Sequence, residues 1–424
     1  MKANELKRII KDGALDAYKH LYADTATTAE RFIKAIDEFT AAFGEEREIY
    51  ILSAPGRSEI LGNHTDHNRG CVLAGAIDRD IIAVAAKNDD GVIRLRSEGY
   101  GLDTVEIAKT DDPKNFKDFS SSALIAGLVR GFINDGFSVG GFDAYTTSDV
   151  LKGSGISSSA AYEVMIGNIL NHLYNGGAVK NQRVAELSQY AENVFFGKPC
   201  GLMDQMACAV GGFVYMDFED PNAALITPID FSLSAAGYTL CIVNTGGNHA
   251  DLNEDYASVP LEMKKVAAIL GGEVLRGYAE ADMINAIPKI REEAGDRAVL
   301  RALHFVRENE RVLRARDALI GGKLDSFFDT VKASGNSSFK YLQNVYTTKN
   351  VSEQGLSLAL ALTDGFLSDG EGAFRVHGGG FAGTIQAYIR RERVAEYEAL
   401  MNSVFGEGAV MKLNIRPEGA VRLF

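Results

Sequence analysis

The stretch SDVLKGSGISSSAAYEVMIGNIL, residues 148–170, decides the fold. A glycine-rich turn at 153–156 follows a strand-like segment, and three serines at 157–159 open a segment whose apolar residues recur at helical spacing. Glycines let the backbone approach an anion, and the free amides at a helix N-terminus favour negative charge. The pattern predicts a phosphate-binding loop, with a simple helix cap as the alternative. It is not a Walker A loop, because no Gly-Lys-Ser/Thr follows the glycines.

Composition limits the classes of protein to which the chain can belong. Its 424 residues favour two domains, and a formal net charge of −13 without a basic cluster argues against a nucleic-acid partner. No apolar run is long enough to span a bilayer, and residues 1–20 lack the apolar block of a secretory signal. The 4 cysteines form no C-x-x-C pair, which suits reduced thiols and a cytoplasmic location.

The segments around the phosphate-binding loop predict an α+β fold. Strand-like segments precede the loop, helical segments follow it at 157–175 and 181–196, and a mostly helical region comes later. This grouping favours two interlocking α+β domains over a doubly wound parallel sheet. Two more amphipathic helices are predicted within residues 1–48, where Thr27 and Glu30 have the spacing of a capping box.

Upstream, residues 53–70 (SAPGRSEILGNHTDHNRG) form a loop crowded with polar side chains between two strand-like runs. His64, Asp66 and His67 are all of metal-ligand types, but no further ligand cluster accompanies them, so a metal site is the minor interpretation. A Ser-His-Asp hydrolase is weaker still, because the G-x-S-x-G nucleophile motif is missing. The loop is a candidate binding site whose ligand its composition leaves open.

Downstream, residues 189–212 (QYAENVFFGKPCGLMDQMACAVGG) contribute two carboxylates. Glu192 lies on a predicted helix, and a carboxylate together with a serine hydroxyl is ordinary magnesium ligation. Asp204 lies among apolar residues and would be costly to bury unpaired, so Arg57 is its expected partner. The alternatives are a solvated helix charge for Glu192 and a helix cap for Asp204.

Together these stretches resemble the galactokinase branch of the GHMP small-molecule kinase family. APGRSEILGNHTDHNRGCVLAGAID is similar to the galactokinase signature, LKGSGISSSAAYEV to the family's phosphate loop, VHGGGFAGT to its glycine-rich third motif, and AENVFFGKPCGLMDQ to the segment with the catalytic aspartate. The four motifs occur in the family's order. The resemblance implies an α+β, GHMP-kinase-like fold with two domains: a ribosomal-S5-like mixed domain at 49–215 and an α+β domain at 216–424. Residues 1–48 lie outside the resemblance and are expected to form a helical extension packed on the first domain.

The resemblance also implies roles for individual residues. Asp204 is expected to orient the sugar's anomeric hydroxyl and to accept its proton late in transfer, and Arg57 to restrain Asp204. Because a nearby cation lowers the pKa of a carboxyl group, Asp204 should be a weak base. ATP phosphates are expected at Gly153, Ser154, Gly155, Ile156, Ser157, Ser158 and Ser159, and at Gly378, Gly379 and Gly380. Magnesium is expected at Ser159 and Glu192. The sugar is expected at Asn63, His64, Asp66, His67, Gly201 and Tyr256.

Two departures from the family's Gly-Glu-His-Thr-Asp-Tyr-Asn loop leave three functional hypotheses. Asn63 replaces the glutamate that is expected to bind the sugar's 6-hydroxyl, and His67 replaces the tyrosine. The favoured hypothesis is an ATP-dependent kinase that converts galactose to galactose 1-phosphate. The second is a kinase of a related pyranose such as galacturonate, because asparagine removes a charge that would repel a 6-carboxylate. The third is a non-catalytic sugar and ATP sensor, against which the intact Glu192, Asp204 and Arg57 argue.

The sequence also predicts what the chain should bind. ATP and Mg²⁺ are the expected cofactors, and a small-molecule sugar is the expected partner. Neither nucleic acid nor a membrane is expected to be a partner, given the acidic charge and the missing apolar span. The oligomeric state stays open, with a monomer favoured.

Overall fold

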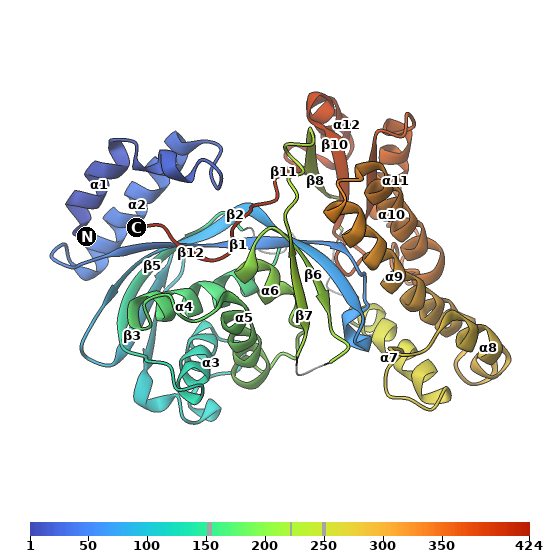
Figure 1. Cartoon of the computed structure of the whole chain (residues 1–424), viewed down its shortest axis with the longest axis horizontal. Helices are drawn as coiled ribbons and strands as arrows, with labels where there is room; N and C mark the ends of the chain where they lie inside the picture. Colours follow the sequence, from blue (N-terminus) through green and yellow to red (C-terminus); the bar gives the residue numbers. More distant parts are fainter. Residues whose placement is uncertain (151–154, 221–222, 248–251) are drawn as a thin grey trace.

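Two β-sheets and the helices packed on them make up the chain (Figure 1). The computed structural model describes residues 1–150, 155–220, 223–247 and 252–424. Within these residues the first sheet has eight strands and the second has four. Long helices cover both sheets, so the architecture is of the α+β class that the sequence predicts.

The first sheet is a mixed sheet built around two long strands. Within the described residues its order is β12-β1-β2-β5-β3-β4, with β6 paired to β2 and β7 paired to β6. The β3–β5 pairing is parallel and the other pairings are antiparallel. The strands are β1 (Tyr50–Leu61), β2 (Cys71–Lys87), β3 (Val92–Ser97), β4 (Leu102–Glu106), β5 (Phe142–Ser148), β6 (Phe213–Asp217), β7 (Leu225–Ile229) and β12 (Val421–Arg422).

Both faces of this sheet are buried, and the alternating side chains of β2 contribute to a different core on each face. Ala83 and Ala85 point to the core formed with the helices that follow β4, whereas Ile82, Val84 and Ala86 point to the core formed with the N-terminal helices. On the first face lie α3 (Ser121–Asn134), α4 (Ser158–Tyr174), α5 (Asn181–Tyr190) with a π-turn at Ala191–Phe196, and α6 (Met203–Val210). On the second lie α1 (Ala3–Lys11), the short 3₁₀ turn Ala14–Tyr18 and α2 (Thr25–Phe43).

The helices of residues 1–48 form where they are predicted, but α2 begins earlier than the sequence pattern suggests. Asp24 is its N-cap, and the Asp24 carboxylate accepts hydrogen bonds from the backbone N–H groups of Ala26 and Thr27, both at 3.1 Å. The predicted capping box of Thr27 and Glu30 is therefore wrong, because the aspartate three residues upstream already satisfies these amides. Gly44 ends the helix with a φ of 95°.

A buried ion cluster joins α2, the first sheet and the C-terminal segment. Asp80 of β2 is 2% exposed and accepts hydrogen bonds from Arg31 Nη1 at 2.6 Å and from Arg416 Nη1 at 3.2 Å. Tyr22 Oη and Ser53 Oγ also donate to Asp80. Four separate segments of the chain thus meet at one carboxylate.

The second sheet has the order β11-β8-β10-β9, with antiparallel pairings throughout. Its strands are β8 (Tyr238–Asn244), β9 (Gly372–His377), β10 (Thr384–Arg390) and β11 (Val410–Leu413). The helices around it are α7 (Asn253–Ile269), α8 (Glu280–Ala294), α9 (Asp296–Ile320), α10 (Leu324–Ser337), α11 (Gly355–Phe366) and α12 (Val394–Phe405). None of the helices in the described part of the chain combines the length and apolar character that a bilayer-spanning segment requires.

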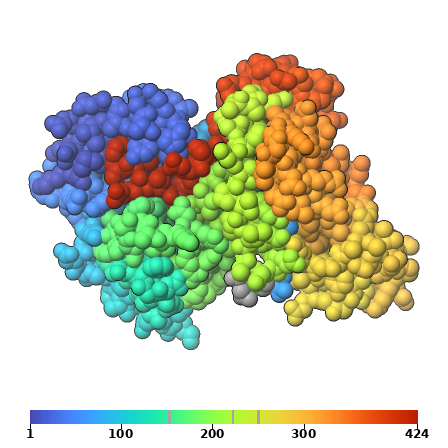
Figure 2. All heavy atoms as spheres, in the orientation of Figure 1, coloured from blue at the N-terminus to red at the C-terminus, as the bar shows by residue number. Residues whose placement is uncertain are grey.

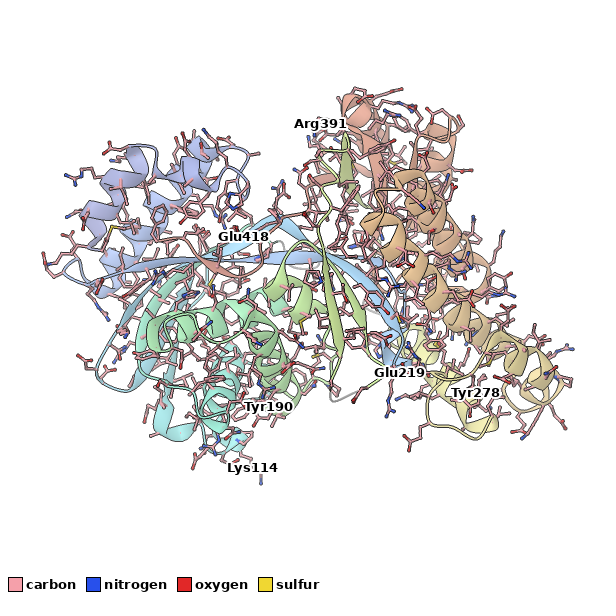
Figure 3. The ribbon with its side chains drawn as sticks, in the orientation of Figure 1. Lys114, Tyr190, Glu219, Tyr278, Arg391 and Glu418 are labelled. Carbon is pink, nitrogen blue, oxygen red and sulfur yellow. The ribbon has the colours of Figure 1, made fainter. Side chains whose placement is uncertain are left out.

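The two halves of the chain are tied together at several points. Figure 2 shows the C-terminal residues lying between the N-terminal helices and the helices of the first sheet, where β12 pairs with β1. The predicted domain division at residue 215 falls inside β6, and β6, β7 and β12 all belong to the first sheet. Figure 3 labels Glu219 near the ends of β6 and β7, where Arg276 of the second half donates to its Oε2 at 3.0 Å.

Candidate active site

Arg57 and Asp204 form the predicted ion pair. Arg57 Nε and Nη2 donate to the two carboxylate oxygens of Asp204 at 2.7 and 2.8 Å. The register of β1 against β2 shifts between Pro55 and Arg57, and such an irregularity re-aims a side chain out of the regular pleat. Burial raises the pKa of Asp204, but the Arg57 charge and hydrogen bonds outweigh burial and lower it overall. Asp204 is therefore an ionised hydrogen-bond acceptor and a weak base at neutral pH.

The N-terminus of α4 lies against this ion pair. Ser157 is the N-cap residue with a φ of 57°, but its hydroxyl donates to Asp204 and makes no capping hydrogen bond to the helix. The first amides of α4 therefore stay available to an anion. Arg57 Nη1 donates to the carbonyl of Gly155 at 2.6 Å, and the backbone N–H of Arg57 donates to Ile156 at 3.1 Å. The predicted phosphate-binding residues Gly153 and Ser154 lie outside the described residues.

Glu192 lies in a buried polar cluster beside α4. Its Oε1 accepts from Lys198 Nζ at 3.0 Å and its Oε2 from Gln205 Nε2 at 2.8 Å. Gln205 Nε2 also donates to Glu163 Oε2 at 3.0 Å. Burial and the neighbouring Glu192 charge raise the pKa of Glu163 well above its ordinary value. The cluster thus brings the carboxyl groups of Glu163 and Glu192 together, through Gln205, beside the helix that carries Ser159.

The donor set of this cluster fits a magnesium ion. Ser159 is exposed on the first turn of α4, and Glu163 follows it by four residues, so both face the same side of the helix. Glu163 Oε1 and Gln205 Oε1 are buried oxygens without a hydrogen-bond partner in the described part of the chain. Hydroxyl, carboxylate and amide oxygens are the hard ligands that Mg²⁺ prefers. The Ser159 and Glu192 roles remain predictions that this donor set supports.

Glu163 and Gln205 are site residues that the sequence analysis missed. Glu163 is a charged residue in the otherwise apolar run that follows the serines, at helical spacing from Ser159, and that pattern was available in the sequence. Gln205 directly follows Asp204 and carried no comparable signal. Its role appears only when α4, α6 and the π-turn at Ala191–Phe196 are packed together.

Residues 62–70 form the loop between β1 and β2, and this 62–70 loop carries His64 and Asp66. His64 adopts a left-handed backbone with φ 60°, and its Nε2 lies 2.9 Å from the carbonyl of Gly379. A carbonyl only accepts, so Nε2 carries the hydrogen and Nδ1 is an acceptor. Burial lowers the pKa of His64 to about 4, so the ring is neutral near pH 7. A Cβ on Gly201 would lie 2.8 Å from Asp66 Oδ2, which places these two predicted sugar-binding residues in contact.

Asn63 and His67 occupy different environments. The His67 side chain is 47% exposed, with Nε2 lying 3.7 Å from Asp66 Oδ1. Asn63 is fully buried: its Nδ2 donates to Glu59 Oε1 and to the carbonyl of Gly378, and its Oδ1 accepts from Asn344 Nδ2 at 2.7 Å. Both amide atoms of Asn63 are engaged within the protein. Its predicted contact with a sugar would require these hydrogen bonds to change.

The glycine-rich third motif contacts the 62–70 loop through its carbonyl groups. Gly378 accepts from Asn63 at 2.7 Å, Gly379 accepts from His64, and Gly380 accepts from the hydroxyl of Tyr256 at 2.8 Å. These glycines therefore tie the predicted sugar-binding residues to β9 and α7. Their role at the nucleotide stays a prediction.

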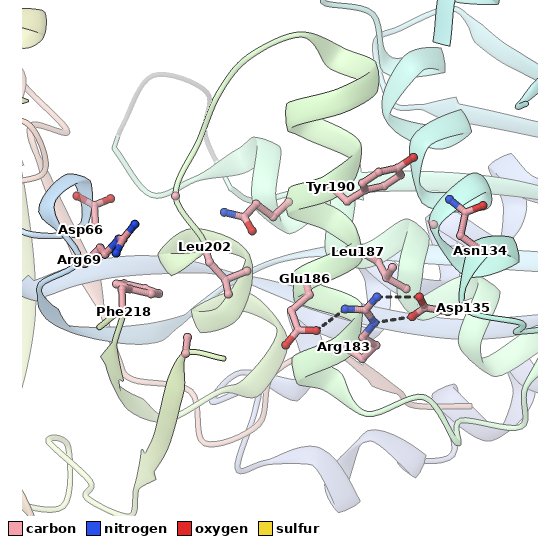
Figure 4. A pocket seen from close by; sticks show the side chains of 14 residues that line it. Asp66, Arg69, Asn134, Asp135, Arg183, Glu186, Leu187, Tyr190, Leu202 and Phe218 are labelled. Carbon is pink, nitrogen blue, oxygen red and sulfur yellow. Dashed lines mark hydrogen bonds and ion pairs between the residues drawn. The ribbon is translucent and has the colours of Figure 1, made fainter. Parts of the chain in front are cut away.

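A cavity of about 530 Å³ adjoins the 62–70 loop (Figure 4). Asp66, Arg69, Gly201 and Leu202 line one end of it, and the ion-paired Arg183 lies at the other. In the residues that the structure describes, no group of three or more His, Cys, Asp or Glu side chains is placed to hold a metal ion.

Comparisons with known proteins show the family of the chain. The galactokinase galactose-binding signature matches residues 37–87, and the GHMP kinase N-terminal domain matches residues 123–212. The galactokinase of Streptomyces coelicolor is 33% identical over 351 residues, which are 82% of this chain and 86% of that protein. The chain belongs to the galactokinase family.

A second galactokinase sequence supports this assignment, and a solved galactokinase structure supports the fold. The galactokinase of Clostridium tetani is 29% identical over 360 residues, 84% of this chain and 88% of that protein. The crystal structure of Lactococcus lactis galactokinase complexed with galactose matches with a TM-score of 0.75 at 21% identity, over 91% of this chain and 98% of that one. The GHMP-kinase fold and the family resemblance predicted from the sequence are thereby confirmed, while the roles of individual site residues remain predictions.

Proposed function

We propose that the chain is a galactokinase, which transfers the γ-phosphoryl group of ATP to the anomeric hydroxyl of galactose and gives galactose 1-phosphate. One observation carries the assignment. Arg57 and Ser157 of the phosphate-binding loop both donate hydrogen bonds to the Asp204 carboxylate. Asp204 follows Gly201 by three residues, and Gly201 lies against Asp66 of the 62–70 loop. A single acceptor thus lies where the two predicted substrate-binding loops meet.

The environment of Asp204 favours orientation of the hydroxyl over strong basic catalysis. The carboxylate can accept a hydrogen bond from the anomeric hydroxyl and hold that oxygen in line with the γ-phosphorus. As the new O–P bond forms and the bond to the ADP oxygen breaks, the hydroxyl proton becomes acidic and passes to Asp204 late in the step. Because Arg57 lowers the pKa of Asp204, early proton abstraction is disfavoured. Phosphoryl transfer depends mainly on positioning and charge stabilisation, which suits this design.

The remaining machinery lies on the phosphate side. The free amides of α4 would bind the ATP phosphates. Ser159 and Glu192 would hold Mg²⁺, which when bound neutralises charge on the β- and γ-phosphates. Lys198, the ion-pair partner of Glu192, is 56% exposed, so water can solvate its ammonium group when the carboxylate binds the metal ion.

The test is an assay of ADP release with a panel of sugars, with the product identified by NMR. Galactose should give the highest kcat/KM, and the phosphate should be on carbon 1. Galactose- and ATP-dependent thermal stabilisation without ADP release would instead indicate a sugar sensor. A higher kcat/KM for galacturonate would overturn the substrate assignment.

The Glu192→Gln variant should need at least about tenfold more Mg²⁺ for half-maximal activity, because an amide is a poorer magnesium ligand than a carboxylate. Its galactose KM should stay close to that of the parent. The matched control is Glu398→Gln, which alters a carboxylate on α12 that pairs with Lys412 of β11 in the second sheet. A raised galactose KM with unchanged Mg²⁺ dependence would contradict the metal assignment.

The Gly201→Ala variant should raise the galactose KM on the order of tenfold or more, because a displacement of about 1 Å at a substrate-positioning group has effects of this size. The added Cβ would lie 2.8 Å from Asp66 Oδ2 and push that carboxylate out of place. The KM for ATP should not change. Gly365→Ala serves as the control, because its added Cβ meets nothing within 4 Å. Equal changes in both KM values would show that the effect is a general loss of structure.

A further inference from the structure

The 62–70 loop is held at both ends by α9, a helix from the second half of the chain. Glu308 Oε1 accepts a hydrogen bond from the backbone N–H of Gly62 at 3.2 Å. Asn309 Oδ1 accepts one from the backbone N–H of Cys71 at 2.7 Å. Gly62 directly follows β1 and Cys71 is the first residue of β2. Two adjacent side chains of one helix therefore fix the points where the loop leaves and re-enters the sheet.

His304, one turn earlier on α9, holds the residue that precedes His64. Its Nε2 lies 3.0 Å from the carbonyl oxygen of Asn63, and its Nδ1 lies 2.9 Å from the hydroxyl of Ser337 on α10. Because a carbonyl only accepts, Nε2 donates to Asn63 and Nδ1 accepts from Ser337. Burial lowers the pKa of His304 to about 4, so the ring keeps this neutral arrangement near pH 7.

Glu308, which binds the start of the loop, is itself fixed by contacts with Ser334 and Arg311. Glu308 is fully buried, its Oε1 also accepts from Ser334 Oγ, and its Oε2 accepts from Arg311 Nε at 2.6 Å. Burial raises the pKa of Glu308, but the Arg311 charge outweighs burial and the pKa falls to about 2. The carboxylate is therefore ionised, and a charged acceptor makes a stronger hydrogen bond than a neutral one.

We propose that His304, Glu308 and Asn309 are positioning residues for sugar binding. They act through the backbone of the 62–70 loop, whose conformation decides where His64 and Asp66 point. The inference rests on the proposed function, because it treats this loop as the galactose-binding loop. Loss of one of these hydrogen bonds leaves a buried backbone group unsatisfied and lets the loop shift, while the ATP-binding end of α4 lies outside the network.

Asn309 offers the sharpest test, because it is only partly buried and tolerates substitution better than Glu308. Asn309→Leu keeps the size of the side chain but removes the acceptor for the Cys71 amide. We expect the galactose KM to rise on the order of tenfold, with kcat and the KM for ATP changed less than about twofold. Asn309→Asp keeps an oxygen for the Cys71 amide but loses the hydrogen bond from Asn309 Nδ2 to the Phe305 carbonyl, so it should raise the galactose KM clearly less than Asn309→Leu does.

A second pair of variants and a control protect the test against a general loss of stability. Glu308→Leu should raise the galactose KM in the same way, and Glu308→Gln, which keeps an oxygen for Gly62, should raise it less. Val312→Ala is the control: Val312 is buried on the same helix within the main core, so the variant should lower the unfolding temperature without raising the galactose KM.

The outcomes separate this inference from the proposed function. If the parent releases no ADP with galactose, the proposed function fails. The loop inference is then judged by galactose binding in calorimetry, where Asn309→Leu should bind more weakly than Asn309→Asp. If the parent is active but Asn309→Leu has the parental galactose KM, or loses ATP affinity equally, the positioning role is overturned.

Discussion

Replacement of Asp204 by alanine is expected to reduce kcat with galactose by a factor of about 10²–10⁴, the usual loss when a positioned acid–base group is removed. Asp204 is the acceptor that faces the anomeric hydroxyl in the proposed reaction, and the phosphates are held by other groups. ATP affinity should therefore remain close to the parental value. Steady-state kinetics and titration with a fluorescent ATP analogue measure the two quantities separately.

Asp204→Asn is the companion variant, because it preserves the shape of the side chain and one acceptor for Arg57. It should retain more thermal stability than the alanine variant, which leaves the Arg57 guanidinium with Gly155 as its remaining partner. Its kcat should nevertheless fall strongly, since a carboxamide is far too weak a base to accept the hydroxyl proton. An alanine variant with more than about a tenth of the parental turnover would contradict the proposed role.

The largest effect on stability is expected from Asp80→Ala. Removing one partner from a buried ion cluster costs about 3–5 kcal/mol, because the opposite charges stay buried without compensation. Here those charges are Arg31 and Arg416, the second of which is 1% exposed in its side chain. Urea unfolding followed by circular dichroism measures the change. Asp149→Asn is the matched control, since Asp149 pairs with the same Arg31 but is 52% exposed, and its loss should cost less than about 1 kcal/mol.

The same cluster predicts a pH dependence of stability. Burial raises the pKa of Asp80, but Arg31 and Arg416 outweigh burial and lower it to about 2. The folded-state pKa lies below the unfolded value of about 3.9, so the contribution of Asp80 to stability is fully present above about pH 4 and is lost as the pH falls toward about 2. The alanine variant should lack this part of the acid transition. Parallel stability curves for parent and variant across this range would refute the assignment.

The parts of the site that depend on local sequence could be predicted. The glycine and serine run before α4 predicts a phosphate-binding loop or a helix cap, and an aspartate among apolar residues needs a cation. The second inference predicts the Arg57–Asp204 pair, although 147 residues separate the two side chains. The α+β class followed from the grouping of strand-like and helical segments. These inferences rest on residue chemistry that does not depend on the exact packing of the two halves.

The parts that depend on distant packing could not be predicted. The Asn63 amide looked free to meet a sugar, but its partners Asn344 and Gly378 lie 281 and 315 residues away in the sequence. His304 and Glu308 look like ordinary polar positions of an amphipathic helix, and only the contact of α9 with the 62–70 loop reveals their use. Tertiary contacts of this kind leave no periodic signal in the sequence.

The pairing of β12 with β1 has a consequence for the order in which the molecule folds. Leu52 pairs with Arg422, so one edge of the first sheet closes only through a contact that spans almost the whole chain, and such contacts form slowly. Until then the start of β1 presents unpaired N–H and C=O groups, and the core under α1 and α2 lacks Leu423. During refolding, the slow pairing of β12 with β1 within one molecule therefore competes with association between open strand edges of different molecules. The refolding yield should fall steeply as the protein concentration rises.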